Sequence, residues 1–288
     1  MDARILRDFV PAKEFFVGID SDGCVFDSME IKQKECFAPM FIKHFHLQAA
    51  SKYARQVWEH VNLYSKDRGC NRFLALILVL ELLRKKPEVV ARNVAIPSTK
   101  ALQQWTALES KLSNQTLEAE VQRGNQPLAP VLAWSRAVNA AIEDIVKDVP
   151  PFPCVRPCLE IISQQADAMV VSQTPTEALR REWKEHHIDG YVRLIAGQEL
   201  GSKTQHLELA ARGKYAPNHI LMIGDAPGDY KAATANDALF YPIVPGAEER
   251  SWERLLLEGL PRFFKGLFAG AFARQLLEEF DASLQANG

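Results

Sequence analysis

The clearest sign of the fold is the segment Phe15-Phe16-Val17-Gly18-Ile19-Asp20-Ser21-Asp22-Gly23. Its first five residues form a short apolar run that ends abruptly at Asp20. Such a run, without polar alternation, is typical of a strand that is buried on both faces of a sheet. Gly23 indicates a turn just after it. The sequence therefore predicts a buried strand that ends at two carboxylates.

Similar short apolar runs recur four more times, at 168–171, 191–196, 220–223 and 238–243. Amphipathic stretches such as 176–187 and 203–212 lie between them and predict helices. Strands that alternate with helices form βαβ units, in which the strands are parallel and the helices cover both faces. We therefore expect an α/β fold with a Rossmann-like parallel sheet.

The alternation is interrupted between residues 28 and 149, where no strand-like run occurs. Helical patterns dominate there, at 34–45, 52–63, 72–86, 98–112 and 130–147. Closely spaced prolines, Pro150, Pro151 and Pro153, then predict a stiff extended linker. We expect an all-helical domain, 29–148, inserted into a discontinuous core, 1–28 and 149–288. From about residue 247, two amphipathic helices are expected to extend the core.

The composition is that of an ordinary soluble globular protein, with 47% hydrophobic and 24% charged residues. A net charge of −2 argues against a nonspecific nucleic-acid binder, which is usually strongly basic. No apolar run is long enough to span a bilayer, and the N-terminal residues do not resemble a signal peptide. Five cysteines without CxxC spacing suggest free thiols. We expect a cytoplasmic protein that binds no membrane, as a monomer or as a homodimer formed through its C-terminal helices.

The near-zero net charge hides an uneven distribution. Residues 28–150 hold 17 Lys and Arg against 12 Asp and Glu, a net of +5, and the rest hold 17 against 24, a net of −7. Two explanations fit equally well: an anionic ligand held between the domains, or complementary charges that help the domains dock.

Carboxylates follow two of the predicted strands, where ligands of open α/β sheets bind. Asp20 and Asp22 follow the first strand, and Asp225 and Asp229 follow the run at 220–223. Four acids on one sheet edge would repel one another unless a hard cation lay among them, and Mg²⁺ prefers oxygen ligands. Taken singly, each acid could instead cap a helix or a turn.

Four segments together resemble the motifs of the haloacid dehalogenase superfamily, in the same order. Residues 19–28 resemble its DxDGT motif, 170–175 its Ser/Thr motif, 201–203 its Lys motif and 223–229 its GDxxxD motif. The resemblance covers the α/β core, whereas the inserted domain matches only in position and helical character, like the family's helical cap. One departure is Cys24, which stands where the family usually has Thr; we expect it to pack rather than to react.

The resemblance implies a role for each of the four acids. Asp20 would be the nucleophile that forms an aspartyl-phosphate, and Asp22 the general acid and base. Mg²⁺ would be held by Asp20, the backbone carbonyl of Asp22 and Asp225, while Asp229 would orient the groups around the metal.

Three further residues are implied to bind the phosphate. Ser172 would donate its hydroxyl and Gln173 its backbone N–H to a phosphoryl oxygen, and Lys203 would offset negative charge on the phosphate and on Asp20. In this superfamily dehalogenases lack an acid two residues after the nucleophile and phosphonatases have a small residue there, so Asp22 favours a phosphoester.

The resulting prediction is a Mg²⁺-dependent phosphatase acting on a small phosphorylated metabolite. A phosphomutase would use the same residues and return the phosphoryl group to its substrate. A non-catalytic phospho-ligand-binding or receiver-like module fits less well, because a receiver has about 120 residues without a large insertion, and a degenerate binder would have lost Asp20 or Asp22.

Substrate selection is expected in the inserted domain, at the polar loop 64–72 between two apolar helices. Lys66, Arg68 and Arg72 are candidates to contact an anionic or hydroxyl-rich part of the substrate. The alternative is a solvated turn between helices, with Arg72 near a helix start.

Overall fold

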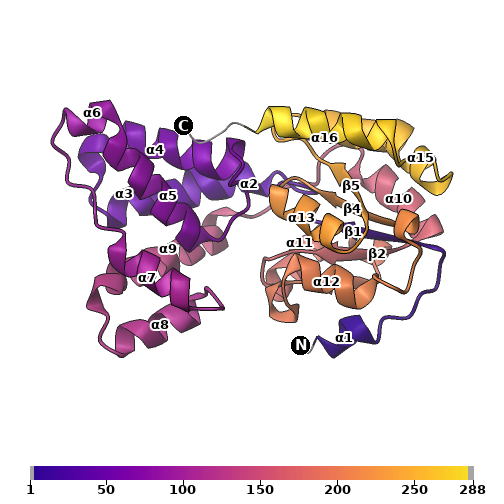
Figure 1. Ribbon diagram of the computed structural model, residues 1–288, viewed down its shortest axis with the longest axis horizontal. Helices are drawn as coiled ribbons and strands as arrows, with labels where there is room; N and C mark the ends of the chain where they lie inside the picture. The colour runs from indigo at the N-terminus through magenta and orange to yellow at the C-terminus, as the bar shows by residue number, and fades with distance from the viewer. Residues whose placement is uncertain (1–2, 285–288) are drawn as a thin grey trace. The chain divides into compact units, whose positions relative to one another are not determined.

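A computed structural model of the chain describes residues 3–284, so the outermost residues of the predicted core, 1–2 and 285–288, lie outside it. The contacts divide the described chain into two compact units (Figure 1). Residues 3–28 and 148–284 form the first, here called the α/β unit, and residues 29–147 form the second, the helical unit.

The α/β unit is built on a parallel sheet with the strand order β3-β2-β1-β4-β5. Its strands are β1 (Phe15–Ile19), β2 (Ala166–Val171), β3 (Leu194–Ala196), β4 (Ile220–Gly224) and β5 (Leu239–Pro242). The central strand is β1, whose Ile19 pairs with Val170 on one side and with Ile223 on the other. The predicted α/β fold is confirmed.

Four strands differ from their predicted bounds, and β4 differs only by the added Gly224. β2 begins at Ala166, two residues earlier than expected, because buried Asp167 interrupts the apolar run without ending the strand. β3 is shorter than the predicted 191–196, since Tyr191 belongs to a 3₁₀ turn, and β5 is likewise shorter than 238–243.

Helices connect the strands and extend the unit beyond β5. They are α1 (Arg4–Arg7), α10 (Val155–Gln165), α11 (Thr176–Glu185), α12 (Lys203–Ala210), α13 (Pro227–Ala235), α14 (Glu248–Arg254), α15 (Leu260–Phe264) and α16 (Ala271–Ser283), with a π-helical turn η8 (Leu255–Gly259). Short 3₁₀ turns are η5 (Asp189–Tyr191), η6 (Gln198–Leu200) and η7 (Pro217–His219).

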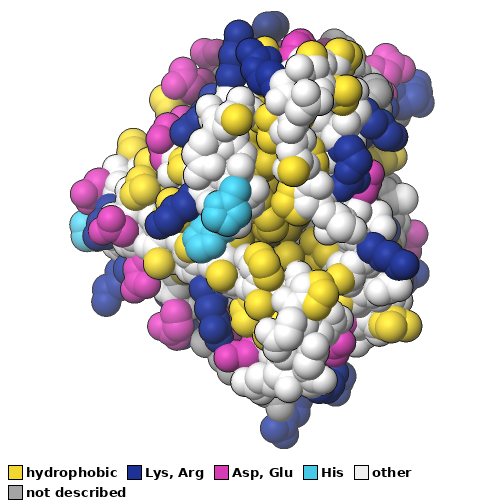
Figure 2. Space-filling view, turned by 90° about the vertical axis from the view of Figure 1, so that its left-hand side faces the viewer, with side chains coloured by type: hydrophobic (Ala, Val, Ile, Leu, Met, Phe, Trp, Pro, Cys, Tyr) yellow, Lys and Arg dark blue, Asp and Glu magenta, His cyan; other side chains and the backbone are white. Residues whose placement is uncertain are grey.

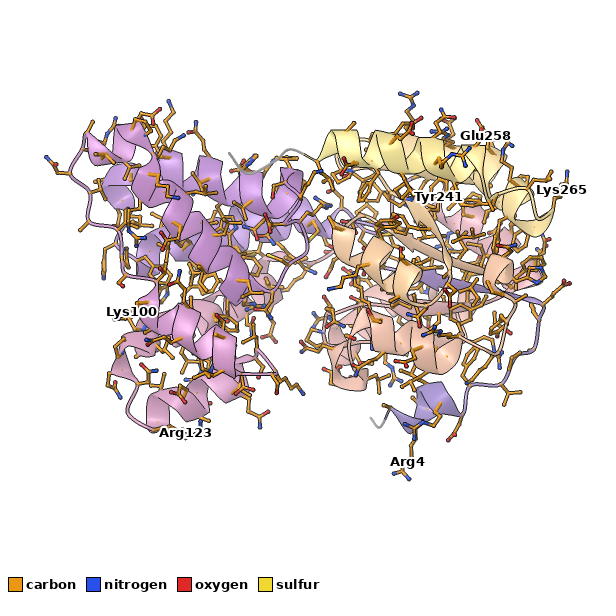
Figure 3. All side chains as sticks on the ribbon, viewed as in Figure 1. Arg4, Lys100, Arg123, Tyr241, Glu258 and Lys265 are labelled. Atoms are coloured by element: carbon orange, nitrogen blue, oxygen red, sulfur yellow. The ribbon has the colours of Figure 1, made fainter. Side chains whose placement is uncertain are left out.

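Alternate residues of each strand face two hydrophobic cores, one on either side of the sheet. Val17 and Ile19 pack with α10, α11, α14 and α15, whereas Phe16 packs with α1, α12 and α13. α16 runs along β5 and contributes Phe272 to the first core and Phe280 to the second, so it covers an edge strand (Figure 1). In Figure 3 the labelled Tyr241 lies within the unit, and its hydroxyl donates to the Ser251 carbonyl at 2.7 Å.

The helical unit is described throughout, and no residue of it belongs to a strand of the sheet. Its helices are α2 (Ser28–Ile31, which begins at the junction), α3 (Ala38–His44), α4 (Ser51–Glu59), α5 (Arg72–Lys85), α6 (Pro87–Val90), α7 (Lys100–Leu108), α8 (Asn114–Gln122) and α9 (Ala129–Ile145). Two π-helical turns, η1 (Lys32–Phe37) and η3 (His60–Tyr64), continue α2 and α4, and two 3₁₀ turns are η2 (Gln48–Ala50) and η4 (Gln126–Leu128).

Aromatic side chains form the centre of the helical unit. The Trp58 ring lies 5.9 Å from Phe37 and 5.7 Å from Trp134, measured between ring centroids, and its indole N–H donates to Gln33. Helix α8 was not predicted because Leu117 is its only buried side chain, which leaves little amphipathic pattern. No helix in residues 3–284 is long and apolar enough to cross a membrane.

Candidate active site

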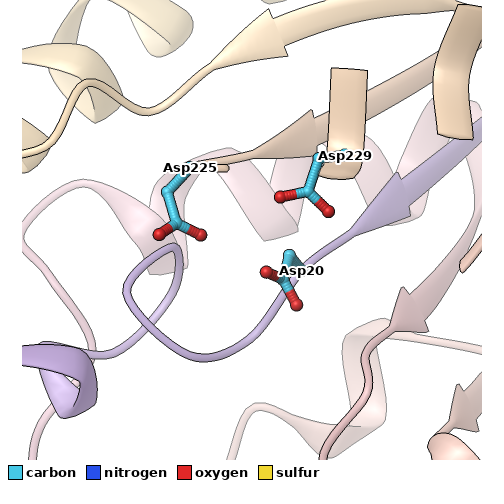
Figure 4. Close-up of side chains that lie close together, drawn as sticks. All are labelled: Asp20, Asp225 and Asp229. Atoms are coloured by element: carbon cyan, nitrogen blue, oxygen red, sulfur yellow. The ribbon is translucent and has the colours of Figure 1, made fainter. Parts of the chain in front are cut away.

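Three carboxylates meet at the carboxyl ends of the central strands. Asp20 directly follows β1, Asp225 directly follows β4, and Asp229 lies in the first turn of α13. At least one oxygen of each carboxylate lies within 4.8 Å of an oxygen of the others (Figure 4). All three side chains are buried, with exposed fractions of 5%, 1% and 0%. The parallel sheet thus brings together acids that are 205 and 209 residues apart.

The position of Asp229 depends on a glycine at the end of β4. A Cβ atom on Gly224 would lie 2.3 Å from the Asp229 Cγ, closer than real Cβ contacts allow. The backbone N–H of Ala226 donates to Asp229 Oδ2 at 3.1 Å, which fixes the carboxylate at the start of the helix. Gly224 therefore permits the approach that aims Asp229 toward Asp20.

Lys203 neutralises part of this negative charge. Its ammonium donates to Asp20 Oδ2 and to Asp229 Oδ1, both at 2.7 Å, and its side chain is 15% exposed. Burial alone would lower the pKa of Lys203, but the Asp20 and Asp229 carboxylates raise it above its usual value. Ser202 and Gln205 cap α12 reciprocally and so fix the helix start that carries Lys203. Lys203 remains a cation at neutral pH.

One lysine does not balance three carboxylates. Burial raises the pKa of Asp20 well above its usual range, and the neighbouring carboxylates of Asp229 and Asp225 add to this against the effect of Lys203. Burial also raises the pKa of Asp229. A buried cluster of oxygen ligands with excess negative charge is the donor set that a hard divalent cation such as Mg²⁺ prefers.

Asp22 lies outside the cluster of three and has its own partners. The Ser28 hydroxyl donates to its Oδ1 at 2.5 Å, and the Thr174 hydroxyl donates to its Oδ2 at 2.6 Å. The turn that carries Asp22 is tight, and Gly23, the next residue, has a φ of +74°. Sequence reasoning gave no role to Thr174, although it lies in the quoted Ser/Thr motif two residues after Ser172.

The loop that follows β2 is tied to the loop that follows β3. Ser172 is 2% exposed, and its Oγ accepts the backbone N–H of Thr174 at 3.1 Å. The exposed Gln173 donates its side-chain amide to the Gly201 carbonyl at 2.9 Å, and the backbone N–H of Gln198 donates to the Thr174 carbonyl at 3.1 Å. These bonds hold the predicted phosphate-binding residue Ser172 close to the loop that leads to Lys203.

Cys24 is a packing residue. It is fully buried, and burial, with the nearby carboxylates, raises the pKa of its thiol well above the usual value. Its carbonyl accepts the indole N–H of Trp252 at 2.7 Å. A protonated, inaccessible thiol is unreactive.

The predicted substrate contacts of the helical unit have mainly internal partners. Arg68 is 4% exposed and donates to the Leu63 carbonyl at 2.8 Å. Arg72 lies over the Phe37 ring, 5.0 Å from its centroid, and burial lowers its pKa to about 10. Its guanidinium also donates to Ser135 Oγ and to Asn139 Oδ1, at 3.1 and 2.7 Å. Of the three candidates, Lys66 is the exposed one, and a ligand contact by any of them stays a prediction.

No family model and no curated protein matches the chain. Similar solved structures include a haloacid dehalogenase-like family hydrolase from Streptococcus pneumoniae, with 14% identity and a TM-score of 0.47 over 86% of this chain and 98% of that one. A subfamily IA hydrolase of the same superfamily from Geobacter sulfurreducens has 12% identity and a TM-score of 0.39, over 81% of this chain and 89% of that one. A predicted phosphoglycolate phosphatase from Haemophilus somnus has 16% identity and a TM-score of 0.43, over 83% of this chain and 92% of that one. Similarity this distant says nothing about the activity of the chain. A function can be inferred only from the side chains of the site.

Proposed function

We propose that the chain is a Mg²⁺-dependent phosphatase of the haloacid dehalogenase type, which hydrolyses a phosphoric monoester of a small metabolite. The main observation behind the proposal is that Asp20 and Asp22 have separate sets of partners. The Asp20 carboxylate is held by Lys203 beside two further carboxylates, while Asp22, two residues on, is held separately by two hydroxyls.

Asp20 is the proposed nucleophile. The Ser21 backbone N–H donates to its Oδ1 at 2.8 Å and Lys203 donates to its Oδ2 at 2.7 Å, so the carboxylate is fixed in orientation. A carboxylate oxygen attacks phosphorus in line, the P–O bond to the leaving alkoxide breaks, and an aspartyl-phosphate forms.

Asp22 is the proposed general acid and base. In the first step its carboxyl group gives a proton to the leaving alkoxide, and in the second step its carboxylate takes one from a water molecule. That water attacks phosphorus, which releases inorganic phosphate and restores Asp20. The hydroxyls of Ser28 and Thr174 donate to the Asp22 carboxylate and fix its orientation, which supports this proposed role.

Asp20 and Asp225 would hold Mg²⁺ together with the backbone carbonyl of Asp22, and Asp229 would orient the groups around it. The cation supplies the positive charge that lets an anionic phosphate approach the buried carboxylates. Ser172 and Lys203 would donate to the phosphoryl oxygens. The helical unit is proposed as the cap that selects the substrate, and the net charge of +5 over residues 28–150 favours an anion.

A panel of phosphorylated metabolites, assayed with Mg²⁺ for released inorganic phosphate, tests this proposal. Asp20→Asn should lose phosphate release, whereas Asp237→Asn should keep it, because Asp237 is an exposed residue paired with Arg212. Release that survived Asp20→Asn would contradict the mechanism. Conversion of a phosphosugar to its isomer without phosphate release would assign the same residues to a phosphomutase.

A further inference from the structure

The loop that follows β3 contains an acidic residue, Glu199, to which the proposed phosphatase chemistry gives no role. Its side chain is exposed. Exposed acidic side chains are common in this chain, as the face of the helical unit in Figure 2 shows, so exposure does not single out Glu199. Its partners do, because its Oε2 accepts both the backbone N–H of Thr176 at 3.0 Å and the Thr176 hydroxyl at 2.7 Å.

These two hydrogen bonds fix the start of α11. Thr176 is the first residue of this helix, and Pro175 before it has no side-chain group that can cap the helix. The cap is therefore supplied by Glu199, which lies 23 residues further along the chain. Partial burial alone would raise the pKa of Glu199, but the hydroxyl and the backbone N–H of Thr176 lower it below its usual value. The side chain is thus an anion at neutral pH, which is the charge that a helix start favours.

The loops that follow β2 and β3 are in direct contact beside this cap. A Cβ atom on Gly197 would lie 2.5 Å from the Thr174 carbonyl oxygen and 2.6 Å from the Thr176 backbone nitrogen, closer than real Cβ contacts allow. The backbone N–H of Gln198 donates to the same Thr174 carbonyl at 3.1 Å. The hydrogen bonds of Glu199 therefore strengthen a junction at which residues 172–176 pack on residues 197–201.

The loop on the β2 side of the junction holds two groups of the proposed active site. Ser172, the proposed phosphate donor, accepts the backbone N–H of Thr174 at 3.1 Å. The Thr174 hydroxyl donates to Asp22 Oδ2 at 2.6 Å. Thr174 is only two residues from Thr176, so the cap on Thr176 restrains both groups.

The loop on the β3 side leads to the proposed phosphate-binding lysine. Lys203 follows Glu199 by four residues, and its ammonium donates to Asp20 Oδ2 at 2.7 Å. Ser172 and Lys203 are both proposed to donate to the same phosphoryl group. The distance between these two donors depends on how firmly the two loops are joined.

We propose that Glu199 is a positioning residue, which holds residues 172–176 against residues 197–201 through its bonds to Thr176. Without touching the phosphate, it sets the spacing of the donors Ser172 and Lys203. The inference rests on the proposed function, because it takes these two side chains as the groups that bind phosphate.

Binding of inorganic phosphate, measured by calorimetric titration with Mg²⁺ present, tests this spacing without any turnover. Glu199→Ala removes the cap at an exposed position and should raise the Kd for phosphate about fivefold or more. Glu199→Gln keeps an acceptor oxygen and should bind phosphate to within about twofold of wild type. Glu160→Ala is the matched control and should leave the Kd unchanged, because Glu160 is also exposed but accepts its bond from the Tyr191 hydroxyl, before β3.

A glycine pair tests the junction from its other side. Gly197 has a φ of −101°, which alanine also adopts, so Gly197→Ala changes the contact and not the backbone preference. The added methyl group would force the two loops apart and should weaken phosphate binding about fivefold or more. Gly190→Ala should leave binding unchanged, because a Cβ atom there meets no atom within 4 Å.

Circular dichroism and urea unfolding establish that each variant is folded before the Kd values are compared, and Gly197→Ala decides the question if Glu199→Ala does not fold. Weaker phosphate binding by Glu199→Ala, with recovery in Glu199→Gln, supports the proposal. A loss of stability with an unchanged Kd overturns it, as does the absence of phosphate binding to wild type. If wild type and variants bind phosphate as expected but wild type releases none from any ester, the phosphatase proposal fails and the positioning role stands.

Discussion

Buried carboxylates lie at both ends of the same sheet, and their surroundings differ. Near the start of β2, Asp167 is fully buried and accepts four hydrogen bonds. Two come from the backbone N–H groups of Ala12 and Lys13, at 2.8 and 3.0 Å, and two from the Tyr215 hydroxyl and the Arg193 guanidinium, both at 2.7 Å. Together these donors tie the N-terminal segment and the loops before β3 and β4 to the sheet.

The net pKa shifts of the carboxylates at the two ends have opposite directions. Burial alone would raise the pKa of Asp167, but its hydrogen-bond donors lower it below the usual value. At the other end, burial raises the pKa of Asp20 and Asp229, and Lys203 only partly opposes this. The charge of Asp167 is therefore compensated by hydrogen bonds within the fold. The charge of the cluster at the other end is only partly compensated, which favours binding of a cation.

The largest expected effect is at Asp20, the proposed nucleophile. Asp20→Asn should lower kcat/KM for phosphate release by about 10⁴-fold or more, because the displacement loses its attacking group. The free energy of unfolding should stay equal or rise, since one buried negative charge is removed. Phosphate assays and urea denaturation measure the two quantities. A loss of several kcal/mol in stability would make Asp20 a structural residue like Asp167.

Asp167→Ala should have the opposite profile. It leaves four donors without their acceptor and should lower the free energy of unfolding by about 3–5 kcal/mol, while kcat/KM of the folded fraction stays near the wild-type value. Asp237→Asn is the control, because the exposed pair of Asp237 with Arg212 contributes at most about 1 kcal/mol and Asn tolerates the φ of +56° at this position. If urea denaturation gave the two variants the same free energy of unfolding, Asp167 would not stabilise the fold, and the proposed difference between the two ends of the sheet would be wrong.

His206 extends the comparison to a buried base. It is fully buried in α12, and burial, followed by the charge of Lys203, lowers its pKa to about 4. As the pH falls below about 6.5, His206 becomes protonated in the unfolded chain, whereas in the folded chain it stays neutral until about pH 4. The free energy of unfolding therefore decreases between pH 6.5 and pH 4. The penalty is on the order of 3 kcal/mol.

The pH dependence of unfolding for wild type and His206→Gln tests this prediction. The stability difference between the two proteins should shift in favour of the variant as pH falls from 7 to 4. Parallel curves would show that His206 is already protonated in the folded state or does not titrate in this range.

The smallest expected effect is at Asp229, which we propose to act through the metal. Asp229→Asn should lower kcat/KM by about 10- to 100-fold and raise the Mg²⁺ concentration needed for half-maximal activity. If the activity of the variant depended on Mg²⁺ concentration as that of wild type does, Asp229 would act through its ion pair with Lys203 and not through the metal.

The sheet and the main acids could be predicted because their signals are local. Asp20 and Asp225 each follow an unbroken apolar run, and parallel strands place such positions on one edge whatever the sequence between them. Asp167 was not predicted, because a charge inside an apolar run resembles the end of a strand, and only the folded chain brings Arg193 and Tyr215 to it.

Contacts between distant residues could not be predicted from the pattern. Thr174 reaches Asp22 across 152 residues, and Arg72 reaches Asn139 across 67. The sequence identifies Arg72 as a cation in a polar loop, but whether its guanidinium contacts a ligand or a neighbouring helix depends on how the helices pack. Side-chain partners of this kind are set by tertiary packing rather than by periodicity.

The central claim is that the carboxylate cluster at the ends of β1 and β4 is built for a cation and not for stability. The most direct test is the free energy of unfolding of wild type and Asp225→Asn, each measured in urea with EDTA and with saturating Mg²⁺. In EDTA the variant should equal or exceed wild type, because one buried negative charge is gone. Mg²⁺ at 100 times its Kd should stabilise wild type by about 2.7 kcal/mol and the variant by much less. A variant less stable in EDTA, with no effect of Mg²⁺ on either protein, would contradict the claim.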